Sequence, residues 1–151
     1  MTDLSNIVSD GQGSVVFVRP DGDSHLTDIR DGRSWNTALG WTDFLNAKDK
    51  LYDGDMVCLA GGTYQVPVTL KFSKGLTIAG DFDPSLTDTT AAAVYPTNTP
   101  TVLSGDANGD GTADAGDLCA IMAFDFSKDG IESLPIRLRG ITLTGAYVPK
   151  D

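Results

Sequence analysis

Residues 53–84 read DGDMVCLAGGTYQVPVTLKFSKGLTIAGDFDP and contain a phrase that returns along the chain. In this phrase a short apolar run is followed by a small residue, a glycine and a polar turn. Its four copies are VCLAGG at 57–62, LTIAGD at 76–81, TVLSGD at 101–106 and ITLTGA at 141–146. The gaps between their glycines approximate one or two units of about 20 residues, with the missing copy expected at 119–123. Such a unit predicts a solenoid, in which each repeat buries its apolar face against its neighbours.

The composition agrees with a chain of short strands and turns. Seventeen glycines and seven prolines in 151 residues disfavour long helices. The net charge of −10 opposes binding to nucleic acid or to anionic lipid. No apolar run approaches the ~20 residues that span a bilayer.

The order of segments predicts one domain after a short lead-in. Residues 1–14 are polar and without period, and the domain is expected over 15–151. Its first strand, VVFV at 15–18, should end before Pro20, because proline cannot continue a central strand. A short helix is expected over 42–48, capped by Thr42 or Asp43, with Phe44, Leu45 and the stem of Lys48 facing inward.

The two cysteines decide little. Cys58 and Cys119 both fall in predicted strands, so we expect two buried, unpaired thiols. A disulfide between them is the alternative.

Several motifs together carry a resemblance to a known family. DGRSW at 31–35, GD at 54–55 and AGGTY at 60–64 follow one another around the predicted helix. In this order they resemble the N-terminal part of bacterial secreted right-handed parallel β-helix proteins of the pectate-lyase-like superfamily, over about residues 15–146. The resemblance implies an all-β fold, a right-handed parallel β-helix of about four to five coils. It also implies that the short helix covers the N-terminal end of the coils.

The C-terminal end of the predicted solenoid has no such cover. The sequence stops at 150–151, directly after the last predicted strand, which leads us to expect a fragment of a longer protein. An uncapped last coil leaves strand edges and apolar side chains open to water, so we expect self-association there.

An acidic loop at 106–117, DANGDGTADAGD, has the spacing of a calcium site. Oxygen-bearing side chains occupy loop positions 1, 3, 5, 9 and 12, glycine occupies position 6, and position 7 can offer its carbonyl. This is the spacing of an EF-hand-type Ca²⁺ loop, except that aspartate replaces the usual glutamate at position 12. The predicted ligands are Asp106, Asn108, Asp110, Thr112, Asp114 and Asp117.

Two other interpretations of this loop stay open. Aspartate, asparagine and glycine also build ordinary acidic turns, which can show this spacing by chance. The loop also resembles that of dockerin modules, which would make the chain an assembly module. Those modules carry two such loops, each followed by a helix, and here there is one.

No constellation for nucleophilic catalysis is recognisable, and no catalytic residue is assigned. In the β-helix polysaccharide lyases of the superfamily, a basic residue lies on an outer face, and Lys71, Arg137 and Arg139 are the candidates here. Solvated outer-face charge is the simpler interpretation. A strip of aromatic side chains near the turns could instead bind sugar; its members would be Tyr64, Phe82, Tyr95, Phe124, Phe126 and Tyr147.

Three functions therefore stand as hypotheses. The first is a non-catalytic extracellular module of a bacterial surface or secreted protein, structural, adhesive or glycan-binding, with one calcium-stabilised loop. The second is the N-terminal part of a polysaccharide lyase or glycoside hydrolase, and the third is the dockerin-like assembly module. The N-terminus lacks the features of a signal peptide, and we expect that a signal was removed.

Overall fold

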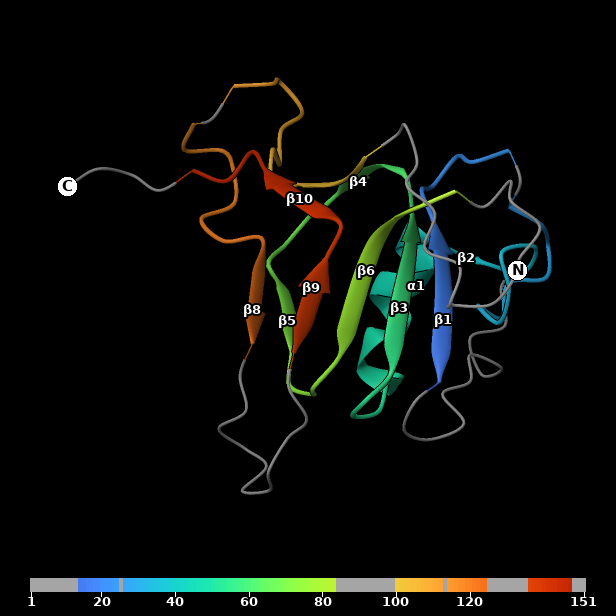
Figure 1. The fold of residues 1–151 in the computed structure, drawn as a ribbon. Coiled ribbons are helices and arrows are strands. Elements are labelled where there is room, and N and C mark those ends of the chain that lie inside the picture. The colour runs from blue at the N-terminus through green and yellow to red at the C-terminus, as the bar shows by residue number, and fades with distance from the viewer. Residues whose placement is uncertain (1–13, 25, 84–99, 113, 125–135, 148–151) are drawn as a thin grey trace.

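The computed structural model describes residues 14–24, 26–83, 100–112, 114–124 and 136–147. The predicted lead-in at 1–14 lies almost wholly outside this range, as do Tyr95 and Phe126. Over the described residues the chain is mostly β, with one short α-helix (Figure 1). Its elements in chain order are β1 (Val15–Arg19), β2 (Leu39–Gly40), α1 (Trp41–Ala47), the 3₁₀ turn η2 (Lys48–Lys50), β3 (Met56–Ala60), β4 (Gly62–Gln65), β5 (Leu70–Phe72), β6 (Thr77–Phe82), β7 (Thr101–Ser104), β8 (Met122–Phe124), β9 (Arg137–Arg139) and β10 (Ile141–Thr144).

All strand pairs between described residues are parallel. The strands form three sheets, ordered β2-β1-β3-β6-β9, β10-β7-β4 and β5-β8. The consecutive strands β3, β4 and β5 each enter a different sheet. Next, β6, β7 and β8 enter the same three sheets in the same order, and β9 and β10 then extend the first two. Neighbours in a sheet are therefore separated along the chain by strands of the other sheets.

The four repeated phrases do not form one stack, so the prediction of a regular 20-residue unit was wrong. VCLA and TIAG lie in β3 and β6 of the five-stranded sheet, whereas TVLS and ITLT are β7 and β10 of the three-stranded sheet. Val57 pairs with Ile78, 21 residues further on, but Ile78 pairs with Leu138, 60 residues further on. The spacing varies because the connections between strands differ greatly in length, and the glycine pattern marks turns in two different sheets.

Alternation along the strands separates two apolar clusters. Val57 and Leu59 of β3 belong to the main core, which also holds Tyr64, Ile78 and Leu103 from the neighbouring strands. Cys58 and Ala60 point to the other face of the same sheet, where Phe17, Trp35 and Phe82 pack on them. Val57 and Leu59 thus face away from Cys58, as the alternation of side chains along a strand requires. The segment before β2 therefore covers the outer face of the first sheet by means of the Trp35 ring, 4.9 Å from that of Phe17.

The short helix forms where it was expected but begins differently. α1 spans Trp41–Ala47 and buries Trp41, Phe44 and Ala47. Neither Thr42 nor Asp43 caps it, because Gly40 occupies the N-cap position. The carboxylate of Asp21 does so from a distant loop, accepting hydrogen bonds from the Thr42 backbone N–H at 3.1 Å and from the Thr42 hydroxyl at 2.5 Å.

The helix region closes the free edges of β4 and β5. The indole N–H of Trp41 donates to the carbonyl of Gln65 at 2.7 Å, and the ammonium of Lys48 donates to the carbonyl of Lys71 at 2.8 Å. The Trp41 ring also meets the Tyr64 ring edge-on at 5.0 Å. Side chains from α1 and η2 thus contact β4 and β5, the strands that come first along the chain in the second and third sheets.

Candidate metal centre

The acidic loop 106–117 lies between β7 and β8 and is held at its base by backbone hydrogen bonds. The N–H of Leu118 donates to the carbonyl of Gly105 at 3.0 Å, which closes the loop on itself. Two further bonds attach this base to the last strand region. Gly105 N–H donates to Thr144 at 2.8 Å, and Tyr147 N–H donates to Leu118 at 2.9 Å. The loop is therefore fastened to the segment around β10.

The first half of the loop is wrapped around Asp106. One carboxylate oxygen of Asp106 accepts from the N–H of Gly109 and the other from the N–H of Gly111, both at 2.8 Å. Both glycines have positive φ, +72° and +76°. This left-handed conformation favours glycine, which explains the residue at loop position 6.

Asn108 contacts Asp110 directly, and Asn108 and Asp114 both lie beside Gly116. The Asn108 amide donates to a carboxylate oxygen of Asp110 at 2.9 Å. A Cβ placed on Gly116 would lie 3.1 Å from both the Asn108 Nδ2 and the Asp114 Oδ1 atoms. The glycine at 116 thus leaves the space into which these two polar groups extend.

Asp117, at loop position 12, joins the two ends of the loop. It is only 8% exposed, and its two oxygens accept from the N–H groups of Ala107 at 3.1 Å and Asp114 at 3.0 Å. A carboxylate oxygen has more than one lone pair, so these bonds leave acceptor capacity unused.

The side-chain oxygens of this loop are of the type that binds a hard cation. Aspartate and asparagine oxygens are the ligands that Ca²⁺ takes, in irregular shells of six to eight. Over the described residues, however, no three histidine, cysteine or acidic side chains lie close enough to form a metal site. Residues 106–117 thus bring the right atoms into one loop, where backbone amides now occupy many of their oxygens. Thr112, expected to act through its carbonyl, donates its N–H to Asp110 at 2.7 Å.

One contact to the loop was not foreseeable from the loop's own sequence. The side-chain amide of Gln65, in β4, donates to the carbonyl of Asp106. These residues meet because β4 and β7 pair in register, with Gln65 opposite Ser104. Only the pairing of β4 with β7 predicts this contact, because the spacing of residues within the loop carries no information about β4.

The basic candidates separate into two places. Arg137 and Arg139 are exposed on β9 in the first sheet, opposite Thr77 and Ala79, and so share a face. Lys71 lies on β5 in the third sheet and is not near them in the strand order. Neither arginine forms an ion pair with any described residue.

The aromatic strip is not supported. Tyr64 and Phe82 are buried at 1% and 2% exposure, so neither can stack on a sugar, and that part of the prediction was wrong. The Tyr64 hydroxyl instead donates to the Ala60 carbonyl at 2.8 Å, and burial raises the pKa of this tyrosine well above its usual value. Phe124 is half-buried and stacks on Phe72 at 5.8 Å.

The cysteines are both unpaired, as expected, but only one is buried. Cys58 lies in β3, whereas Cys119 is exposed in the segment before β8, so the prediction of burial was wrong for Cys119. In this segment Leu118 and Ile121 pack with the main core, whereas Cys119 and Ala120 between them are exposed.

No family model, curated protein or solved structure matches the chain. No described helix is long and apolar enough to cross a membrane. Function must therefore be argued from the described residues themselves.

Proposed function

We propose that the chain is a non-catalytic, extracellular module built on a right-handed parallel β-helix. The observation that carries this proposal is the strand order, in which successive strands from β3 onward visit three parallel sheets in rotation. A chain that winds once around a common core would produce this order. The side chains of α1 and η2 over β4 and β5 agree with a covered N-terminal end.

The role that fits such a module is structural, adhesive or glycan-binding at a bacterial surface or in a secreted protein. A stack of short parallel strands is a rigid, elongated scaffold that presents side chains on flat outer faces. The acidic net charge of −10 suits a soluble surface exposed to cations. Bacterial origin and secretion rest on the family resemblance of residues 15–146. Self-association through the last coil belongs to the same proposal.

Within this module, loop 106–117 is proposed to bind Ca²⁺ through Asp106, Asn108, Asp110, Thr112, Asp114 and Asp117. Four carboxylates within twelve residues repel one another, and a divalent cation offsets that repulsion. Magnesium suits the loop less well, since it demands a tighter octahedron and keeps its waters. The ion's role would be to rigidify the loop and, through the bonds at Thr144 and Leu118, the segment around β10.

A thermal melt tests the calcium site. Calcium that binds the folded loop should raise the melting temperature, because a ligand at 100 times its dissociation constant stabilises by about 2.7 kcal/mol. Asp110→Ala should remove this rise, since it deletes an exposed loop carboxylate without touching the core. Asp28→Ala is the matched control, an exposed aspartate on another loop, and should keep the rise. Identical melts in calcium and in chelator would leave the loop as an ordinary acidic turn.

The second candidate function, the N-terminal part of a polysaccharide lyase or glycoside hydrolase, is favoured by one observation. Arg137 and Arg139 are exposed side by side on β9 without an acidic partner among the described residues. A screen of acidic and neutral glycans distinguishes the two functions. Cleavage of acidic glycans that is lost in Arg137→Ala would support the second function, and glycan binding without cleavage would contradict it.

The dockerin-like alternative finds little support. After the loop, residues 118–121 lead into the strand β8 rather than into a helix. Ile121 and Met122 there pack with the main core instead of forming a separate helical module.

A further inference from the structure

The last strands in the chain are the edge strands of all three sheets. β8 pairs only with β5, β9 only with β6 and β10 only with β7, as far as the structure describes the chain. The outer edges of β8, β9 and β10 therefore present backbone N–H and C=O groups that pair with no other described strand. Unpaired strand edges are templates for pairing with another chain.

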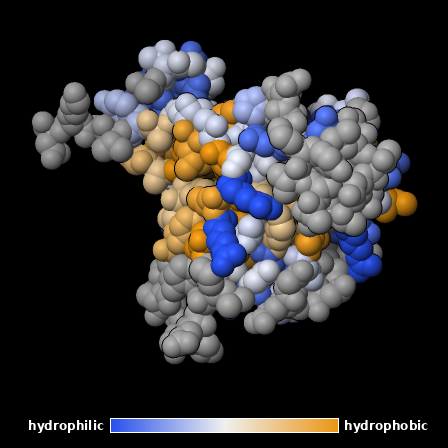
Figure 2. All heavy atoms as spheres, in the orientation of Figure 1, coloured by the Kyte–Doolittle hydropathy of each residue, from blue (hydrophilic) through white to orange (hydrophobic). Residues whose placement is uncertain are grey.

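A hollow of about 430 Å³ opens between these strands, and its lining is largely apolar. Leu138 of β9 and Leu143 of β10 are 42% and 46% exposed, although both sit in strands. Figure 2 shows apolar side chains gathered over the region of β8 to β10. The lining residues are Ile121, Met122, Phe124, Leu138, Leu143 and Ala146, together with Thr144 and Gly145. We call this surface the end face.

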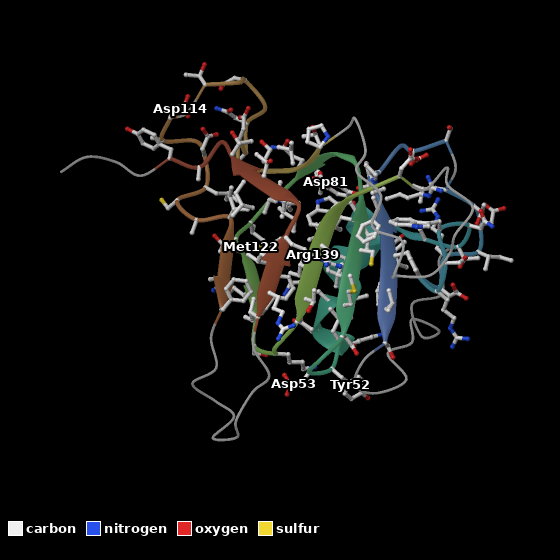
Figure 3. All side chains as sticks on the ribbon, in the orientation of Figure 1. Tyr52, Asp53, Asp81, Asp114, Met122 and Arg139 are labelled. Carbon is white, nitrogen blue, oxygen red and sulfur yellow. The ribbon has the colours of Figure 1, made fainter. Side chains whose placement is uncertain are left out.

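Opposite charges flank the end face. Arg137 and Arg139 are exposed along β9, on one side of the hollow. On the other side, loop 106–117 is fastened to the segment around β10 and carries the exposed Asp110 and half-exposed Asp114. Figure 3 shows Arg139 on the sheet and Asp114 out in the loop. No ion pair joins these groups within one chain over the described residues, so both remain available to a partner.

We propose that the end face is the interface of a twofold symmetric dimer of this chain. The inference rests on the proposed stacking of strands, and it names the partner as a second copy. A twofold axis through the hollow brings the arginines of one copy against the acidic loop of the other, and each contact occurs twice. The leucines of both copies fill the hollow between them. Direct pairing of β9 with its own copy is disfavoured, because it would bring arginine against arginine.

Sedimentation velocity over a concentration series, in chelator so that the loop keeps its charge, tests the apolar contact. The wild-type chain should shift from monomer to dimer, and Leu143→Asp should raise the dissociation constant at least about tenfold. Val68→Asp is the matched control, because Val68 is 67% exposed but lies on a turn between β4 and β5. A wild-type chain that stays monomeric overturns the dimer. So does a Val68→Asp effect as large as that of Leu143→Asp, or growth into open-ended oligomers.

A charge exchange tests the orientation. In the double variant Arg137→Asp with Arg139→Asp, acid would face acid across the interface. In Asp110→Arg with Asp114→Arg, base would face base. Each variant alone should be monomeric, whereas a mixture should form a heterodimer, because both of its contacts then join opposite charges. Circular dichroism on each variant checks that it folds.

The results separate this inference from the proposed function. A folded mixture without a heterodimer overturns the twofold arrangement. If calcium still raises the melting temperature of the Arg137→Asp with Arg139→Asp variant, whose loop is intact, the proposed module stands and only its partner is wrong. Loss of the calcium effect in the wild-type chain, with the heterodimer of the two variants intact, contradicts the calcium site alone.

Discussion

The first and the last strands along the chain are all paired in register, but only the first ones are covered by other parts of the molecule. At the N-terminal end, β1 and β3 are almost wholly buried, and Trp41 and Lys48 donate to carbonyls on the free edges of β4 and β5. At the other end, every residue of β9 and all but Ile141 of β10 are exposed, although both strands are paired in register. Parallel pairing alone therefore does not bury a strand. Burial requires a further element against each face and edge.

The largest expected difference between the two ends comes from a matched pair of side-chain truncations. Leu59→Ala removes a side chain that is 1% exposed in the main core, and it should cost about 2–5 kcal/mol of unfolding free energy. Leu143→Ala, at 46% exposure, should cost well under half as much. Denaturant unfolding of both variants at low protein concentration measures this. Equal losses would show that the C-terminal end is as well packed as the N-terminal end.

The two thiols sharpen the same contrast. Burial raises the pKa of Cys58 from 9.0 to about 12, against a smaller opposing effect of Arg139. Between pH 9 and 12 the unfolded chain loses this proton while the folded chain keeps it. Stability should therefore be full below pH 9 and fall by up to about 1.4 kcal/mol per pH unit above it.

Two controls test the thiol prediction. Cys58→Ala should flatten the alkaline loss of stability, and Cys119→Ala should leave it unchanged. In the native protein, iodoacetamide should modify Cys119 alone, because only this thiol is exposed. Rapid native labelling of Cys58 would contradict the difference in cover.

The smallest expected effect concerns Asp21, which caps the helix α1 at the covered end. Asp21 accepts from the N–H and hydroxyl of Thr42 at the start of α1. Asp21→Ala should cost about 1 kcal/mol, the usual loss for a helix cap. Asp28→Ala, another exposed loop aspartate, should cost much less, and thermal melts compare the two. An unchanged Asp21→Ala protein would mean that α1 is held by Trp41 and Phe44 alone.

Local patterns predicted the elements better than their arrangement. The end of β1 before Pro20 and the position of the short helix follow from short-range rules, and both predictions are confirmed. The alternation of side chains in β3 obeys such a rule too. The stacking period was misread, because the phrases ending in Gly61 and Gly105 look alike yet lie in different sheets. Similar turn chemistry recurs at every corner of a parallel array, so glycine spacing alone does not give the register.

The candidate metal loop shows the same limit. The sequence predicts the need for glycine at loop position 6, and the positive φ of Gly111 agrees, whereas its ligands for Ca²⁺ stay a prediction. The Gln65 contact and the attachment to Thr144 depend on which strands neighbour β7, and no sequence interval encodes that. Tyr64 and Phe82 were misplaced for a related reason, since residues close to turns can still point inward.

The order in which the strands join their sheets has a consequence for biosynthesis. The covered end comes first along the chain, and Val57 of β3 pairs with Ile78 of β6, only 21 residues later. Domains form from the N-terminus as they leave the ribosome, and short loops close at the lowest entropic cost. Each later strand would then meet an edge that already exists, so that the nascent chain grows its sheets by addition to a finished template. From β6 onward, each new strand adds to a strand already made and becomes the next edge of its sheet.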